Sequence, residues 1–313
     1  MSIALNESKA REFLASNKIQ NCEIVKVAGD ASFRSYYRII SAEKTFVLMF
    51  APPSHEDVKP FIKIDEFLVS CGFFAPKILA KDIDSGFLLL EDFGDDTYNR
   101  VLTKDSSQEF SLYKKAADVL LNLHQFEAPK DLPTYNHALL FREAMLFVDW
   151  YAKENWSSQK KSEFKYLWFK IFDLLSRENQ VLVLRDFHAD NLMTIPQGVG
   201  LLDFQDAVIG SRTYDLVSLL EDARRDVSAD TRQKILEYYI EKSGFDASVF
   251  LREYSILSLQ RNVKILGIFS RLSKRDQKHN YLNFMPRVQA FVEARLEDKI
   301  FSEIKDLIKN DLQ

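Results

Sequence analysis

The sequence predicts an α+β protein with two lobes: a small N-terminal lobe built on an antiparallel sheet, and a larger helical C-terminal lobe. Residues 23–91 contain short alternating or β-branched segments separated by turn residues, a pattern typical of strands. After Asp92 the apolar residues mostly follow helical spacing. A length of 313 residues, 46% of them apolar, is sufficient for two lobes with cores of their own. We expect the lobes to comprise residues 1–93 and 94–313.

The N-terminal lobe is expected to begin with a short helix over residues 10–16. Alternation and β-branched residues then predict three strands, over residues 23–27, 33–40 and 44–50. Pro52 and Pro53 end the third strand, because proline cannot donate to a strand ladder. Helical spacing predicts a helix over residues 58–70, with Gly72 just past its end. Strands over residues 77–81 and 86–91 complete the sheet.

The C-terminal lobe is expected to be largely helical. Periodic segments predict helices over residues 107–126, 139–153 and 162–179, and further helices from Thr213 to the end. Three short apolar segments, residues 181–184, 192–195 and 199–202, read as strands between them.

Composition narrows the classes of function. The chain has 42 Lys and Arg against 46 Asp and Glu, and this balance disfavours a nucleic-acid binder. The two cysteines form no CxxC pair, so neither a disulfide framework nor a zinc site is expected. The N-terminus shows no signal-peptide pattern, and no apolar run approaches the roughly 20 residues that span a bilayer. We expect a cytoplasmic, monomeric protein that acts on a small molecule.

Three polar side chains mark the chemically most informative stretch. Asp186 follows an apolar strand, Asn191 comes five residues later, and Asp203 ends another apolar strand. Side chains at strand ends can converge on one cleft, and Mg²⁺ prefers such oxygen ligands. Phosphoryl transfer needs a metal ion at the phosphates and a carboxylate that accepts the hydroxyl proton. The stretch therefore predicts a phosphoryl-transfer site, and a solvated acidic turn is the alternative.

The same residues resemble a known family. The stretches DFHADN (186–191) and LLDFQD (201–206) are similar to the catalytic and metal loops of aminoglycoside phosphotransferases and choline kinases, which share the protein-kinase-like fold. The resemblance implies that Asp186 is the catalytic base, that Asn191 and Asp203 hold Mg²⁺, and that Asp215 braces the catalytic loop. An acidic residue in the first turn of a helix is the other interpretation of Asp215. Leu184 stands where the family usually has a structural histidine, a departure that bears on this bracing.

The resemblance also implies ATP as the cofactor. Residues 28–36 would fold over its phosphates, although an ordinary hairpin is the alternative for this loop. The family's usual lysine is missing from the third strand, where the expected position is Met49 or a neighbour. Lys44, Arg34 or another basic residue would supply the charge, or the metal alone would, and Glu66 lacks its usual partner. The nucleotide-binding residues implied are Ser32, Phe33 and Arg34 at the phosphates and Leu90, Glu91, Asp92 and Phe93 at the adenine.

Within the family, several segments resemble the anomeric kinases of bacterial cell-wall recycling, which phosphorylate N-acetylmuramate and N-acetylglucosamine at the C1 hydroxyl. These segments include residues 29–39, 88–98 and 202–220. Arg142 is our choice for the muramate lactyl carboxylate, although residues 142–151 also fit an ordinary amphipathic helix. The sugar-binding candidates are His188, Asp190, Gln205, Asp206, Arg142 and Glu143, with Asp149, Trp150 and Tyr151 nearby.

Two alternatives stay open at this point. The first keeps the fold and changes the acceptor to choline, an aminoglycoside or another sugar. The second is a kinase-shaped binding protein without catalysis, suggested by the missing strand lysine and by Leu184. The presence of Asp186, Asn191 and Asp203 favours an enzyme, because a scaffold needs no metal ligands.

Overall fold

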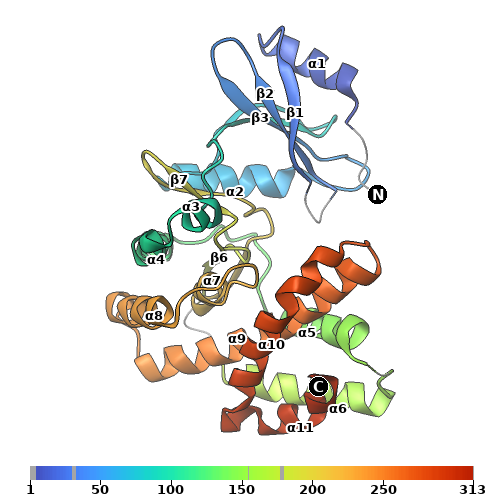
Figure 1. Cartoon of the computed structure of the whole chain (residues 1–313), viewed down its shortest axis with the longest axis vertical. Helices are drawn as coiled ribbons and strands as arrows, with labels where there is room; N and C mark the ends of the chain where they lie inside the picture. Colours follow the sequence, from blue (N-terminus) through green and yellow to red (C-terminus); the bar gives the residue numbers. More distant parts are fainter. Residues whose placement is uncertain (1–4, 30–32, 154, 177–179, 313) are drawn as a thin grey trace. The chain divides into compact units, whose positions relative to one another are not determined.

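A computed structural model describes residues 5–29, 33–153, 155–176 and 180–312 (Figure 1). The chain forms two compact units, which we call the sheet unit (residues 1–101 and 190–206) and the helical unit (residues 102–189 and 207–313). The predicted α+β class, with a sheet lobe and a helical lobe, is confirmed. Residues 190–206 belong to the sheet unit. Asn191 and Asp203 therefore lie in that unit, whereas Asp186 belongs to the helical unit.

The sheet unit is built on an antiparallel sheet that, over the described residues, has five strands in the order β1-β2-β3-β5-β4. One face of the sheet packs against α1, and Phe13, Leu48 and Phe87 belong to the apolar cluster on this face. The alternate residues Met49 and Leu88 face the other way and are also buried. The elements are α1 (Glu7–Ser16), β1 (Glu23–Gly29), β2 (Ser35–Ile40), β3 (Thr45–Phe50), α2 (Lys59–Ser70), β4 (Ile78–Asp82) and β5 (Phe87–Glu91).

A hairpin formed by β7 (Leu192–Ile195) and β8 (Gly198–Leu201) completes the sheet unit. Leu201 N donates to Phe74 O at 2.8 Å, and Thr194 N donates to Asp96 O at 2.8 Å. Gly200 permits a close approach, because a Cβ there would lie 2.8 Å from Cδ2 of Phe93. The hairpin that carries Asn191 and Asp203 at its two ends is thereby fastened to the segment after β5.

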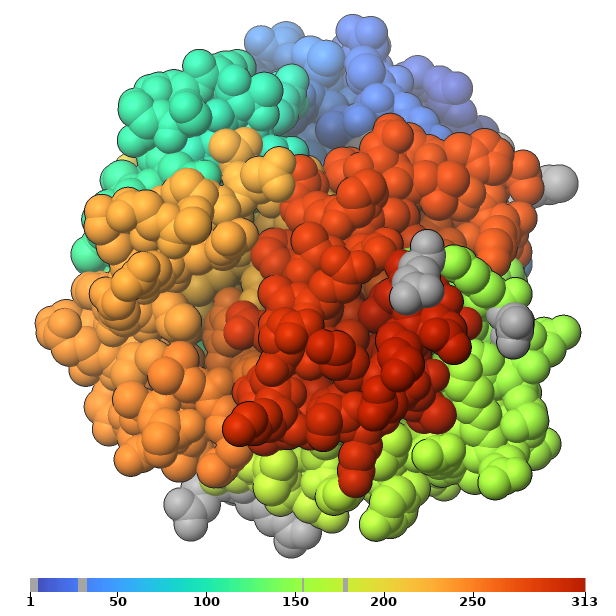
Figure 2. All heavy atoms as spheres, turned by 60° about the horizontal axis from the view of Figure 1, so that its bottom comes forward, coloured from blue at the N-terminus to red at the C-terminus, as the bar shows by residue number. Residues whose placement is uncertain are grey.

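The helical unit surrounds α9, a 28-residue helix whose side chains are mostly buried. Gly267 lets α9 approach the end of α5, since a Cβ there would lie 2.2 Å from the carbonyl carbon of Leu146. The C-terminal segment, red in Figure 2, lies on the face shown, and Asp311 near its end accepts from Trp156 Nε1 at 3.2 Å. The elements of this part of the chain are α3 (Tyr98–Lys104, which spans the division between the units), η1 (Ser106–Gln108), α4 (Glu109–Leu123), α5 (His137–Leu146), η2 (Phe147–Tyr151), α6 (Ser158–Phe172), β6 (Gln180–Val183), β9 (Val208–Ser211), α7 (Thr213–Leu220), α8 (Ala229–Ser243), α9 (Ala247–Lys274), η3 (His279–Phe284), α10 (Met285–Leu296), η4 (Lys299–Phe301) and α11 (Ser302–Leu312).

The structure corrects the sequence prediction at four places. The helix expected over residues 139–153 starts at His137 and becomes a π-helix over Phe147–Tyr151. The helix expected over residues 162–179 ends earlier, at Phe172, where Asp173 caps it. Strand β9, which pairs with β6, and helix α3 were not predicted from the sequence. Within the described ranges, no helix combines the length and apolarity needed to span a membrane.

Asp65 of α2 is an unusual core residue of the sheet unit. It is 2% exposed, and its Oδ2 has no hydrogen-bond partner among the described residues. Burial, aided by the nearby carboxylates Glu66 and Glu91, raises the pKa of Asp65 to about 7. The folded protein therefore holds a proton on Asp65 that the unfolded chain releases near pH 4.

Replacing Asp65 by Asn should remove a pH-dependent destabilisation. Because the folded pKa exceeds the unfolded one, the wild-type protein loses stability as pH rises from about 4 to about 7, and the loss is then constant. We expect Asp65→Asn to gain at most about 4 kcal/mol relative to wild type between pH 4 and pH 8. Urea unfolding at both pH values measures this difference, and Asp84→Asn, at an exposed position, is the control. An equal effect at both pH values would contradict the analysis.

Candidate active site

Asp203 is the centre of a polar cluster in the sheet unit. Its Oδ1 accepts from Gln205 Nε2 at 2.9 Å, and its Oδ2 accepts from Asn191 Nδ2 at 3.3 Å. Arg34 Nη2 lies 3.7 Å from Asp203 Oδ1, and this arginine is 8% exposed. Asp203 also has a φ of 58°, a left-handed backbone that a non-glycine residue adopts at a cost. The structure thus brings together Asn191 and Asp203, the two metal-ligand candidates.

Arg34 is the residue that the geometry favours as a replacement for the missing strand lysine. Met49 is fully buried, and Lys44 places its ammonium 4.9 Å from the centre of the Phe46 ring. Glu66 forms an ion pair with Lys81 at 3.3 Å. Of the two basic residues named from the sequence, Arg34 is the one with a contact to Asp203. A guanidinium here supplies several N–H donors in a fixed plane, which suits phosphate oxygens.

The donor set of this cluster fits a hard divalent cation. Asn191, Asp203 and Asp206 offer amide and carboxylate oxygens, and Gln205 Nε2 also lies 3.3 Å from Asp206 Oδ2. The Oε1 atom of Gln205 is buried and has no hydrogen-bond partner in the described part of the chain. That part also contains no group of three His, Cys, Asp or Glu residues able to hold a metal. Such a sparse, oxygen-rich set suits Mg²⁺, which usually keeps water and phosphate ligands beside one or two carboxylates.

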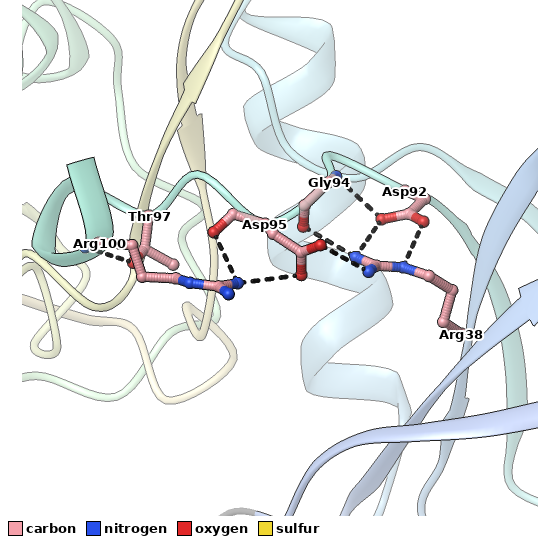
Figure 3. A network of polar contacts seen from close by, with 6 residues as sticks. All are labelled: Arg38, Asp92, Gly94, Asp95, Thr97 and Arg100. Carbon is pink, nitrogen blue, oxygen red and sulfur yellow. Dashed lines mark hydrogen bonds and ion pairs between the residues drawn. The ribbon is translucent and has the colours of Figure 1, made fainter. Parts of the chain in front are cut away.

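The segment expected to meet the adenine is held by an ion network (Figure 3). Both carboxylate oxygens of Asp92 accept from Arg38, at 2.7 and 3.1 Å, and Oδ1 also accepts from Gly94 N at 2.9 Å. Arg38 donates further to Gly94 O and to Asp95 Oδ2, each at 2.9 Å, and Arg100 donates to Asp95 O at 3.1 Å. Burial favours neutral Asp92, yet Arg38 and the Gly94 N–H hold its pKa below the ordinary value. Both oxygens of the Asp92 carboxylate therefore already accept hydrogen bonds, and only the backbone of Asp92 is available to a nucleotide.

The remaining nucleotide candidates lie around this network and in the loop before β2. Leu90 is buried at the end of β5, and Glu91 Oε2 lies 3.4 Å from Lys77 N. The N–H of Phe33 donates to Glu56 Oε1 at 3.2 Å, and its ring lies 4.6 Å from that of His55. Ser32 is outside the described residues.

In the helical unit, Asp215 binds the backbone of Leu184 and Arg185, just before the loop of residues 186–191 that is predicted to be catalytic. Its Oδ2 accepts from Leu184 N at 2.7 Å, and its Oδ1 accepts from Arg185 N at 2.8 Å. Burial raises the pKa of Asp215 to about 7, although these two N–H donors oppose the rise. Both interpretations of Asp215 are thus compatible, since it lies in the first turn of α7 and also binds this loop. Leu184 does not disturb the contact, because Asp215 binds its backbone N–H.

Asp186 follows directly and is partly buried. Burial by itself would favour the neutral acid. Nearby positive charges, that of Lys264 foremost and those of Arg185 and Arg261 among them, hold the pKa of Asp186 below its ordinary value. An ionised carboxylate at this position is able to accept a proton from a hydroxyl group.

The sugar-binding candidates do not form one cluster within either unit. His188 contacts Arg224 Nη1 at 3.1 Å in the helical unit, where Arg142 is exposed on α5 and Glu143 is buried. Gln205 and Asp206 lie beside Asp203 in the sheet unit, and Asp190 there accepts from Asn99 Nδ2 at 2.7 Å. Sequence reasoning missed Arg38, Asp222, Arg224 and Lys264, none of which belongs to a recognisable motif.

The fold and this arrangement define the class as a kinase-like phosphotransferase, and comparison with solved structures agrees. Choline kinase LicA from Streptococcus pneumoniae superposes with a TM-score of 0.68 at 14% identity, over 92% of this chain and 99% of that chain. The aminoglycoside phosphotransferase APH(2'')-Ib, with ADP bound, gives a TM-score of 0.63 at 16% identity, over 91% of this chain and 97% of that chain. These similarities show the fold, and the predicted protein-kinase-like architecture is confirmed.

The chain belongs to the phosphotransferase enzyme family, whose sequence model matches residues 23–253. A curated relative from Pseudomonas aeruginosa, named N-acetylmuramate/N-acetylglucosamine kinase, is 36% identical over 88% of this chain and 85% of its own length. A relative of the same name from Caulobacter vibrioides is 31% identical over 96% of this chain and 94% of its own length. The predicted family and the predicted class of enzyme, a phosphotransferase, are confirmed.

Removal of the Arg38 guanidinium should loosen the segment after β5. We expect Arg38→Met to cost about 3 kcal/mol of stability, because it leaves the buried Asp92 carboxylate without its cation. It should also weaken MgADP binding, since residues 91–93 lose their fixed position. Chemical unfolding and calorimetric titration measure the two effects. Arg100→Met, at an exposed ion pair, is the control, and unchanged nucleotide affinity in folded Arg38→Met would refute the positioning role.

Proposed function

We propose that this chain is an ATP- and Mg²⁺-dependent kinase that phosphorylates the anomeric C1 hydroxyl of N-acetylmuramate and N-acetylglucosamine. The observation that carries the proposal is the 31–36% identity to curated relatives of that name over most of the chain. Asp186, Asn191 and Asp203 together supply the groups that phosphoryl transfer requires. Solved neighbours with ADP or AMP bound support a nucleotide cofactor.

In this proposal, residues 1–93 form the nucleotide-binding lobe, and residues 94–313 supply catalysis and most of the sugar site. Ser32, Phe33 and Arg34 are the proposed contacts to the phosphates, and the backbone of residues 90–93 is the proposed contact to the adenine. Asn191 and Asp203 would hold Mg²⁺, which when bound neutralises charge on the phosphates. Asp206 and Gln205 add oxygens to that neighbourhood and are candidates for contacts with the acceptor.

Asp186 accepts the proton of the acceptor hydroxyl as that oxygen bonds to the γ-phosphorus, while the bond from phosphorus to the ADP oxygen breaks. An anomeric hydroxyl is more acidic than an ordinary alcohol, so a carboxylate is a sufficient base. His188, Asp190 and Arg142 are the remaining proposed contacts to the sugar. Arg142 is the proposed partner of the lactyl carboxylate, because it carries a positive charge. The need for ATP favours the cytoplasm, and we propose a monomer.

Product identification tests the proposal directly. The protein is incubated with MgATP and each sugar, and ³¹P and ¹H NMR spectra locate the new phosphate. Phosphate at C1 of both sugars is the expected result. Turnover only with choline or an aminoglycoside would refute the assignment of the acceptor, and phosphate at C6 would refute the anomeric position.

Two substitutions separate the roles of the carboxylates. We expect Asp186→Asn to lower kcat by about 10²–10⁴-fold, the usual contribution of general base catalysis, with little effect on stability. Asp203→Ala should abolish MgATP binding, because it removes the central acceptor of the Asn191, Gln205 and Arg34 cluster. Stopped-assay kinetics and nucleotide titration with and without EDTA measure these effects. A wild-type kcat in Asp186→Asn would rule out its role as base.

A further inference from the structure

A buried ion network occupies the helical unit beside the catalytic loop. Glu143 of α5 pairs with Lys264 Nζ of α9 at 3.0 Å and also with the guanidinium of Arg185. The side chains of Glu143 and Lys264 are 10% and 11% exposed. The Tyr135 hydroxyl donates a hydrogen bond to Glu143, and Lys264 Nζ donates one to Tyr214 Oη at 3.2 Å. One carboxylate thus joins two cations from separate parts of the chain in a site with little access to water.

Arg185, which directly precedes Asp186, is fixed at both its backbone and its side chain. Its N–H donates to Asp215, and its guanidinium binds Glu143. Its φ of 72° lies in the left-handed region, which an arginine keeps only where the surroundings impose it. The direction in which the chain leaves Arg185 sets where the Asp186 carboxylate points.

The surroundings of Asp186 contain charged groups of both signs. Lys264, Arg185 and Arg261 all act on Asp186, and His188 lies beside them. Glu143 binds Lys264 and Arg185, while the side chains of Asp215 and Asp222 accept from backbone N–H groups of the loop. Buried charges without partners are costly, so loss of Glu143 would release two cations to rearrange next to Asp186.

We infer that Glu143 is a positioning residue for phosphoryl transfer: it holds Arg185 and Lys264 together and thereby orients the Asp186 carboxylate toward the acceptor hydroxyl. The inference rests on the proposed function of Asp186 as the base. It differs from the sugar-binding role that the sequence suggested for Glu143. A positioning role affects kcat, whereas a sugar contact affects the KM for the sugar.

The test compares Glu143→Gln with wild type in full steady-state kinetics. We expect kcat to fall by about 10²-fold, as for a displaced catalytic group, with both KM values unchanged. Glu221→Gln is the matched control, because Glu221 is an equally buried carboxylate that accepts from Ser258 and Asn262 and pairs with Arg295. This control should lose stability and keep its kcat. A raised KM for the sugar with normal kcat in Glu143→Gln would overturn the inference.

A double-mutant cycle tests the contact between Glu143 and Arg185. Arg185→Met should lower kcat as Glu143→Gln does, and Arg185→Lys should retain part of the activity. The kcat of the double variant should be no lower than that of the less active single variant. Multiplicative losses would show independent roles and overturn the inference. If Glu143→Gln does not fold, the Arg185→Met and Arg185→Lys pair decides by the difference in kcat, and equal values would count against it.

Failure of the proposed function gives a different result. If another acceptor replaces the two sugars, the same variants are measured with that acceptor, and the kcat pattern still decides the role of Glu143. If Asp186→Asn keeps a wild-type kcat, then Asp186 is not the base, and the positioning role falls with it.

Discussion

The start of the loop after strand β6 depends on one interaction, the binding of two consecutive backbone N–H groups by the side chain of Asp215. These bonds, at 2.7 and 2.8 Å, fix Leu184 and Arg185 at the point where strand β6 becomes the catalytic loop. A side chain that binds backbone places no demand on the neighbouring side chain, so the loop tolerates Leu184 in place of the family's histidine. The left-handed Arg185 is restrained a second time, because its guanidinium binds Glu143.

The path of the chain explains how two kinds of chemistry are kept apart. Residues 190–206 leave the helical unit and join the sheet unit, where they form a hairpin with the Asn191 and Asp203 cluster at its ends. The sheet unit therefore contains the groups suited to a metal and to phosphates, and the helical unit contains the carboxylate suited to a proton. Along the sequence, only residues 187–190 separate Asp186 from Asn191.

The parts predicted from the sequence are those specified by local patterns. Alternation located the strands of the sheet, and the spacing of Asp186, Asn191 and Asp203 predicted a phosphoryl-transfer site. Contacts between distant residues were not predictable in this way. Arg38 meets Asp92 across 54 positions, and Glu143 meets Arg185 across 42, and no local pattern marks either pair. Strand β9 was missed for the same reason, since its four residues become a strand only through pairing with β6.

In the sheet unit, the positive charge beside Asp203 lies in a loop, and the two neighbouring acids of α2 have different environments. With Met49 filling the apolar interior of β3, no ammonium enters the sheet at that position, and the positive charge beside Asp203 comes from Arg34 instead. The two neighbouring acids of α2 differ in burial. Glu66 turns outward to Lys81, whereas Asp65, buried and without a hydrogen bond to Oδ2 in the described structure, is neutralised by a proton through its raised pKa. Burial thus sets the protonation of Asp65, whereas the exposed Glu66 next to it forms an ion pair, a difference between adjacent residues that the sequence does not indicate.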